Sequence, residues 1–270
     1  MIKIEDCPEY VDNDLNYRII GCAFEAFKTV GPGFREIIYH KIFHQNLLKS
    51  GFSAKYKEVF ELDYHGNKVA EFEVDEIVED KVVLELKSIQ TEFLPGNYAQ
   101  ILNYMQISNI NIGLLINFGV HKAIVKRVIY ESQRIPNAEN WDKRFFDDLP
   151  NMLIQNIIAS LKKIDNEIQP GYPKEVYQNA LKIEFQQRNI FYNDEIAFEL
   201  DIDNIKFTKI QIDFWEIEKH FLLGVLAGNE KPRIYELARM RNYLIKLNLT
   251  HGIIAYWSNK NFQLHGIFVT

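Results

Sequence analysis

The 270-residue sequence has few cysteines, no long apolar run and no excess of basic residues. Its two cysteines, Cys7 and Cys22, are too few for a disulfide framework or a cysteine metal site. No apolar run reaches the roughly 18 to 20 residues that a membrane-spanning helix needs. The acidic start also lacks the pattern of a secretory signal. We therefore expect a globular, cytoplasmic protein.

Acidic residues outnumber basic ones: the sequence has 37 Asp and Glu residues and 31 Lys and Arg residues, which gives a formal net charge of -6. Such a balance gives no general attraction to nucleic acid, so any binding of that kind must use local basic patches. Hydrophobic residues make up 47% of the chain, which is enough to fill proper cores. The length suits one large domain or two of ordinary size.

Hydrophobic periodicity divides the first half of the chain into a regular series of elements. After an acidic tail over 1–14, the pattern predicts helices over 15–30 and 34–51, strands over 56–64, 68–78 and 81–87, a helix over 97–107, and strands over 111–118 and 124–129. A polar and aromatic connector with two prolines follows over 131–150. We place a domain boundary there.

The second half repeats the first at an offset of about 138 residues. Pro32, Gly33 and Tyr39 correspond to Pro170, Gly171 and Tyr177, and with one further residue inserted the pair Asn103-Tyr104 corresponds to Asn242-Tyr243. This register predicts a duplication, with one domain over 15–130 and a second copy over 151–270.

One stretch, 74–88 (VDEIVEDKVVLELKS), carries charges where a core strand should be apolar. It reads as two strands joined at Glu79-Asp80-Lys81, which places Asp75 roughly opposite Glu85. Glu85 and Lys87 are two residues apart and therefore project from one face of their strand. Buried charges cost several kcal/mol unless they are paired or bind a metal. The stretch is therefore the main functional signal in the sequence.

The second copy has lost most of these polar residues while keeping its apolar frame. Glu36, Glu85, Lys87 and Gln100 are replaced by Lys174, Leu223, Val225 and Arg239. Asp213 still stands at the position of Asp75. This pattern is expected if the polar residues of the first copy serve a site rather than the fold. We also predict that Arg239 neutralises Asp213 through an ion pair.

The candidate site of the first copy consists of six residues, namely Glu36, Asp75, Glu85, Lys87, Gln100 and Tyr104. Its three carboxylates form the hard oxygen ligand set that Mg²⁺ or Mn²⁺ prefers. Lys87 would orient an attacking water or stabilise developing charge. Gln100 and Tyr104 share one helix face and could hold a substrate strand or the metal's outer ligands.

Other interpretations of these residues stay open. The strand charges could form a salt-bridged cluster on a solvated sheet face. Tyr39 survives as Tyr177 in the copy that has lost the other residues, which favours packing over chemistry for this tyrosine. Lys55 and Lys57 are candidates for phosphate contacts in the first copy.

Four segments together carry a resemblance to a known family over about 15–130. The run GFREIIY at 33–39, the stretch 74–88, and the runs YAQILNY at 98–104 and GLLINFG at 113–119 resemble the GxxExxY proteins, a family of the PD-(D/E)xK nuclease superfamily. The resemblance implies metal ligands at Asp75, Glu85 and Glu36, and a catalytic lysine at Lys87. It also implies a QxxxY element at Gln100 and Tyr104. One departure is the acidic pair Glu71 and Glu73 just before Asp75, where the family commonly has a basic residue.

These observations lead to an expected α/β protein of two tandem restriction-endonuclease-like domains, each a mixed sheet flanked by helices, with a degenerate second copy. The resemblance implies a Mg²⁺-dependent nuclease, with Mn²⁺ as a substitute, that hydrolyses phosphodiester bonds of nucleic acid, DNA being favoured over RNA. The second copy would serve binding or a pseudo-dimer interface, in a monomer or a homodimer. The alternatives are an inactive nucleic-acid-binding or scaffold protein and, with less support, a hydrolase of other phosphoesters.

Overall fold

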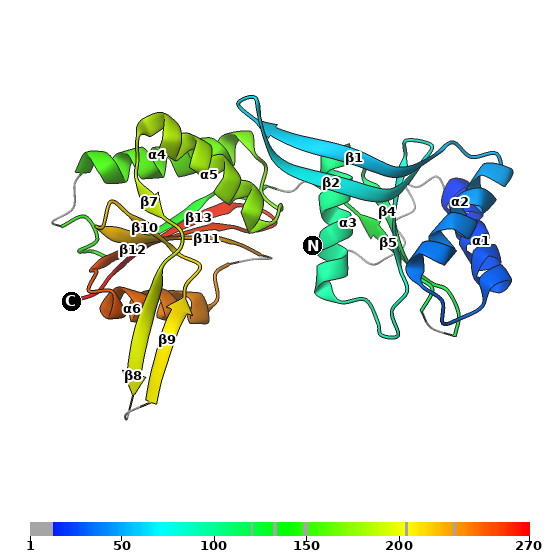
Figure 1. Cartoon of the computed structure of the whole chain (residues 1–270). Helices are drawn as coiled ribbons and strands as arrows, with labels where there is room; N and C mark the ends of the chain where they lie inside the picture. Colours follow the sequence, from blue (N-terminus) through cyan, green and yellow to red (C-terminus); the bar gives the residue numbers. More distant parts are fainter. Residues whose placement is uncertain (1–12, 120, 132–133, 148–150, 203–204, 229–230) are drawn as a thin grey trace. The chain divides into compact units, whose positions relative to one another are not determined.

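The computed structural model in Figure 1 describes residues 13–119, 121–131, 134–147, 151–202, 205–228 and 231–270. The chain forms two compact units. The first unit comprises Met1–Leu62 and Glu71–Ser132, and the second comprises Asp63–Ala70 and Gln133–Thr270. The acidic tail expected over 1–14 lies outside the described residues except for its last two.

The first unit is a five-stranded mixed sheet with helices on both faces. Its elements are α1 (Asn13–Val30), α2 (Glu36–Lys49), β1 (Ala54–Tyr64), β2 (Asn67–Val78), β3 (Val82–Lys87), α3 (Pro95–Ser108), β4 (Ile112–Asn117) and β5 (Ile124–Ile129). The strand order is β1-β2-β3-β4-β5. β3 and β4 pair in parallel, whereas β2 with β3 and β4 with β5 pair antiparallel.

Alternate residues of the central strands supply two separate apolar cores, because successive side chains of a strand point to opposite faces. Leu84 and Leu86 of β3 pack with α1 and α2. Val83 of β3 and Ile77 of β2 pack instead with α3. Asp75, Glu85 and Lys87 share the spacing of this second set, so the sheet directs them toward α3.

The second unit repeats this arrangement with a larger sheet. Its elements are β6 (Ala138–Trp141), α4 (Asn151–Glu167), α5 (Lys174–Arg188), β7 (Tyr192–Asn193), β8 (Ala197–Ile202), β9 (Ile205–Gln211), β10 (Trp215–Ile217), β11 (Phe221–Ala227), α6 (Ile234–Lys246), β12 (His251–Trp257) and β13 (Phe262–Phe268). The order of the large sheet is β6-β13-β12-β11-β10-β7. β11 and β12 pair in parallel, and their outer neighbours β10 and β13 pair with them antiparallel. The expected mixed sheets flanked by helices are confirmed.

A buried tyrosine makes the same contacts in both copies. The hydroxyl of Tyr39 donates to the carbonyl oxygen of Gly31 at 2.5 Å, and the ring stacks on Phe118 with centroids 4.9 Å apart. Tyr177 donates in the same way to Gln169 at 3.0 Å and stacks on Trp257 at 4.3 Å. The structural role that survival of this tyrosine favoured is confirmed.

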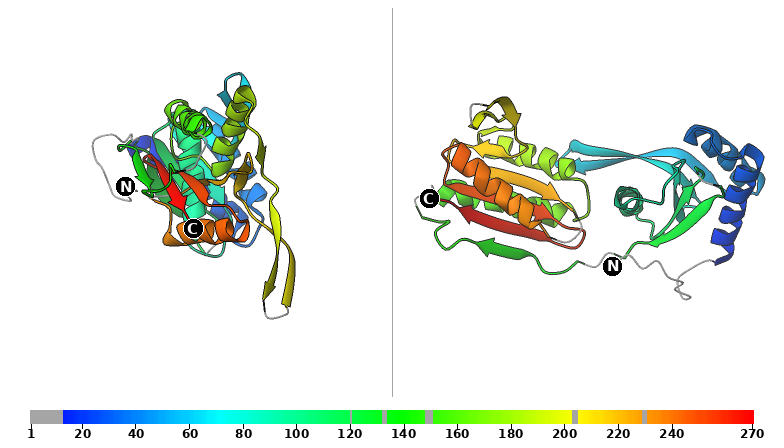
Figure 2. Two further views of the ribbon diagram at one scale, coloured as in Figure 1. Left: turned by 90° about the vertical axis from the view of Figure 1, so that its left-hand side faces the viewer. Right: turned by 90° about the horizontal axis from the view of Figure 1, so that it is seen from below.

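Two features of the second unit differ from a plain copy of the first. The counterparts of β1 and β2 are interrupted, and β8 and β9 form a separate two-stranded sheet that projects from the unit in Figures 1 and 2. The connector also contributes structure, because β6 pairs in parallel with β13 and Phe145 is fully buried. In the described part of the chain, no helix has the length and apolar character needed to cross a membrane.

Candidate functional site

The hairpin of β2 and β3 places the central charged residues on the α3 face of the first sheet. Three residues separate the paired Val78 and Val82 at its turn, and Glu79 and Asp80 both have the positive φ that the central residues of a type I′ turn require. Glu76 pairs with Leu84, which sets Asp75 at the level of Glu85, as the sequence predicted. Asp75 is 5% exposed and Glu85 is fully buried. The backbone N–H of Leu86 donates to Oδ2 of Asp75 at 2.9 Å and fixes this carboxylate against β3.

Each of these two carboxylates has a lysine partner. Lys87 forms an ion pair with Glu85, its neighbour on the same strand face. Lys57 of β1 reaches Oδ1 of Asp75 at 2.6 Å and Oε1 of Glu73 at 3.0 Å. Lys57 therefore compensates the acidic residue that precedes Asp75. It was expected only as a phosphate contact, and its pairing with Asp75 was missed.

Burial shifts the proton affinity of the central pair. Removal from water, followed by the charge of Asp75, raises the pKa of Glu85 to about 8 from its ordinary 4.5, although Lys87 opposes the shift. The pKa of Lys87 is also raised, because Glu85, Glu36 and Asp75 together outweigh the opposing effect of burial. Oε2 of Glu85 is buried and has no hydrogen-bond partner among the described residues.

The two polar residues of α3 face the same charges. Nε2 of Gln100 donates to the hydroxyl of Tyr104 at 2.8 Å, so the predicted side-by-side arrangement on the helix is present. Burial raises the pKa of Tyr104; the bond from Gln100 opposes this shift, and the carboxylates of Glu85 and Asp75 add to it. The tyrosine therefore lies within electrostatic reach of the central pair.

Glu36 is the least closely connected member of the predicted set. It begins α2, and its negative charge contributes to the raised pKa of Lys87. Within the described residues, no three Asp, Glu, His or Cys side chains are grouped as a ready-made metal centre. The ligand set of Asp75, Glu85 and Glu36 therefore stays a prediction.

The second copy brings together the residues at the corresponding positions. Nη2 of Arg239 lies 3.2 Å from Oδ1 of Asp213, which confirms the predicted ion pair. Lys174, at the position of Glu36, lies 3.8 Å from Oδ2 of the same aspartate. Positions equivalent to Asp75, Glu36 and Gln100 thus converge in the second unit, where two cations surround one carboxylate.

A second polar cluster on the opposite face of β2 was not anticipated. The fully buried Glu76 lies 2.9 Å from Nδ1 of His44 and 3.6 Å from Nε2 of His40. His40 also lies at hydrogen-bonding distance, 3.0 Å, from the carbonyl oxygen of Asp75. The sequence did contain a signal for this cluster. His40 and His44 are four residues apart on a predicted helix, and Glu76 follows Asp75 and therefore points to the other face of the strand.

The mixed sheet flanked by helices, with an aspartate on one strand and Glu-x-Lys on the next, defines a domain of the PD-(D/E)XK nuclease type. A family model described as the PD-(D/E)XK nuclease superfamily matches residues 13–128 and again residues 151–264. The chain belongs to this superfamily, and the family model matches both copies. No curated protein and no solved structure matched the chain. The narrower resemblance to the GxxExxY proteins is not confirmed and stays a hypothesis.

Proposed function

We propose that the first unit is a metal-dependent nuclease that hydrolyses phosphodiester bonds of nucleic acid, DNA rather than RNA, and that the second unit is an inactive copy. The observation that carries this proposal is the buried pair of Asp75 and Glu85 beside Lys87. Two carboxylates in so little water destabilise each other, as the raised pKa of Glu85 reflects. The counterparts of Glu85 and Lys87 differ from the sequence expectation by one residue, because Gly224 and Leu226, rather than Leu223 and Val225, lie on the face of β11 that packs on α6. Stability of the fold alone therefore does not require this glutamate and this lysine.

The residues of the first site suit a hard divalent cation such as Mg²⁺ or Mn²⁺. The buried Oε2 of Glu85 has no hydrogen-bond partner among the described residues, and a carboxylate oxygen is the donor these ions prefer. Asp75 and Glu85 would hold the ion, with Glu36 as the third carboxylate. When bound, such an ion lowers the pKa of its water and neutralises charge on the phosphate.

The other residues have roles that follow from their charges and positions. Lys87, held beside Glu85, would orient the attacking water or stabilise the charge that develops on the phosphate. Gln100 and Tyr104 are bonded to each other on α3 and would position the substrate strand. Lys57 would act as an internal cation that holds Asp75 in place before the metal binds.

The proposal is tested with labelled single- and double-stranded DNA and RNA, incubated with Mg²⁺ or Mn²⁺ and, separately, with a chelator. Asp75→Asn and Lys87→Ala are expected to abolish cleavage, while isothermal titration should show that Asp75→Asn also loses metal binding. Asp213→Asn is the matched control, because it neutralises the equivalent, ion-paired aspartate of the second copy. Equal cleavage by the wild type and the Asp75 variant would identify a contaminating nuclease.

The second candidate is a nucleic-acid-binding or scaffold protein without activity. It is favoured by the bond between Lys57 and Asp75, which resembles the pairing of Arg239 with Asp213 in the second unit. The two candidates differ in what metal does to the folded protein. A nuclease should be stabilised against thermal unfolding by Mg²⁺ or Mn²⁺, because a ligand that binds only the folded state raises its melting temperature. An inactive scaffold should show no such shift.

A further inference from the structure

The turn between β1 and β2 is part of the second unit, where it packs on α4 and α5. The hydroxyl of Tyr64 donates to Oε1 of Glu184 at 3.0 Å, and Nε2 of His65 lies 2.8 Å from Oε2 of Glu167. Nδ2 of Asn179 donates to the carbonyl oxygen at position 69 at 2.8 Å. Tyr64 is only 2% exposed. A hairpin tip from the first copy thus fills a site on the two helices of the second.

The equivalent hairpin of the second copy contacts α6 near its base, where the ring of Phe198 lies 5.9 Å from that of Tyr243, but residues farther along it are exposed. β8 and β9 pair only with each other among the described strands. At an offset of 138 residues, Phe207 of β9 is the counterpart of Val69, yet it is 47% exposed where Val69 is 3% exposed. Ile205 on the same strand is 60% exposed. A two-stranded ribbon is marginal in water by itself, so these apolar side chains indicate a contact surface.

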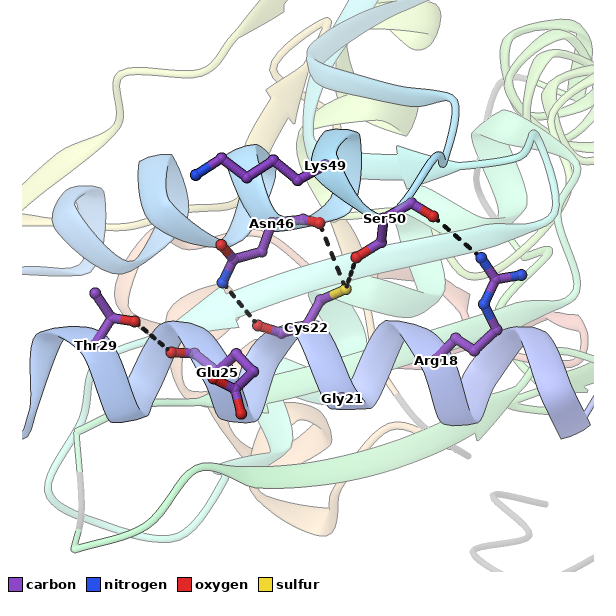
Figure 3. A pocket seen from close by; sticks show the side chains of 8 residues that line it. All are labelled: Arg18, Gly21, Cys22, Glu25, Thr29, Asn46, Lys49 and Ser50. Carbon is purple, nitrogen blue, oxygen red and sulfur yellow. Dashed lines mark hydrogen bonds between the residues drawn. The ribbon is translucent and has the colours of Figure 1, made fainter.

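The site that such a hairpin would fill exists on the first copy as a pocket of about 430 Å³ between α1 and α2 (Figure 3). Its lining residues include Glu25, Thr29 and Asn46. At the same offset these are the counterparts of Lys163, Glu167 and Glu184, which contact Tyr64 or His65 in the second unit. The pocket of the first copy therefore corresponds to the surface that is occupied in the second.

The charge of this pocket has changed in the direction that suits the second hairpin. Glu167 and Glu184 are replaced by the uncharged Thr29 and Asn46. Arg18 and Lys49, which also line the pocket, replace the uncharged residues at 156 and 187, whereas Glu25 and Ser50 replace Lys163 and Arg188. The formal charge of the lining therefore changes from 0 to +1. β8 carries the exposed Glu199 and is acidic in sequence. Arg18 and Lys49 of the pocket are thus suited to the acidic β8, while β9 carries two lysines and leaves the ribbon as a whole neutral.

We propose that the β8–β9 ribbon of one chain docks into the pocket between α1 and α2 of a second copy of this chain. The contact repeats between chains the packing that the β1–β2 turn makes on α4 and α5. It joins two different surfaces, so it is a head-to-tail interface that closes reciprocally into a dimer or extends into a filament. The proposal is independent of nuclease activity.

Sedimentation velocity of the full chain over a wide concentration range tests the proposal with one variant on each surface. Phe207→Ser removes the apolar contact of the ribbon. Gly21→Trp fills the pocket from α1, where an added Cβ meets no atom within 4 Å. Phe191→Ser is the control, because this phenylalanine is 74% exposed and lies outside the ribbon. Circular dichroism melting verifies that each variant is folded, and Gly21→Glu replaces Gly21→Trp if the latter is not.

The wild type and the Phe191 variant are expected to self-associate, and each surface variant to associate roughly tenfold more weakly or not at all. Mixing the two surface variants should restore association into a heterodimer, because each supplies the surface that the other lacks. A wild type that is monomeric at all concentrations overturns the proposal. So does a Gly21 variant that associates normally, which would indicate contacts between ribbons, or a mixture that stays monomeric.

Discussion

Replacing Glu85 with glutamine should change how the stability of the metal-free protein depends on pH. Glu85 is fully buried, and its pKa is raised to about 8 in the folded chain from an ordinary 4.5. Between these two values the folded state binds the proton and the unfolded state has released it. The contribution of Glu85 is therefore most favourable below its unfolded pKa, and it is lost as the pH rises through its folded pKa. Glutamine has no such dependence.

The size of the effect follows from the pKa difference. A shift from 4.5 to about 8, at about 1.36 kcal/mol for each pKa unit, sets an upper limit of about 5 kcal/mol. A typical domain is stable by only about 5 to 15 kcal/mol, so the loss is a large fraction of the total. Lys87, which pairs with Glu85, opposes the shift and is already included in it.

The measurement is hydrogen exchange of the β3 amides in a chelator, from about pH 5 to about pH 9, after correction for the intrinsic exchange rate. All three tryptophans, Trp141, Trp215 and Trp257, lie in the second unit. Their fluorescence during urea unfolding therefore gives an internal control. Glu92→Gln, at an exposed position, is the matched variant. The wild type should lose protection relative to Glu85→Gln as the pH rises. Parallel profiles for the two proteins would refute the reasoning.

Two further predictions concern single side chains. Lys57→Gln is expected to tighten Mg²⁺ binding severalfold in titration calorimetry, because the ammonium that lies 2.6 Å from Asp75 competes with a cation for that carboxylate. Unchanged or weaker binding would contradict this. Lys55→Gln is the control, because it removes a partner of Asp80 instead. Tyr39→Phe and Tyr177→Phe should each lower stability by about 1 to 2 kcal/mol in urea unfolding, since each removes a hydroxyl that donates one hydrogen bond and accepts another. A loss confined to one of them would show that the two sets of contacts are not equivalent.

The central hairpin could be predicted from the sequence because its determinants are local. The alternation of Glu85 and Lys87 fixes their common face, and the turn at Glu79 and Asp80 fixes the register that brings Asp75 opposite. The ion pair of Arg239 with Asp213 could be predicted because the two copies provide an internal comparison. Each of these inferences needed only spacing along one chain.

Other contacts depend on packing that the spacing does not encode. Lys57 belongs to a strand two positions away from β3 in the sheet, and only its long side chain decides that it meets Asp75 rather than solvent. His40 and Glu76 meet because α2 crosses β2 at that level. β6 was hidden in a segment whose prolines and mixed polarity are typical of a connector. The break in the counterpart of β2 likewise has no clear sequence signal.

The turn of residues 63–70 gives the duplication an unusual chain path. The chain passes between the two units at 62–63, at 70–71 and again at 132–133. A cut in the connector therefore does not release two self-sufficient halves, because a fragment that begins after the connector lacks the turn that covers Glu184 and the neighbouring lysine at 163. The second copy therefore depends on a segment of the first to cover part of its own surface, and the two copies are linked by more than the connector.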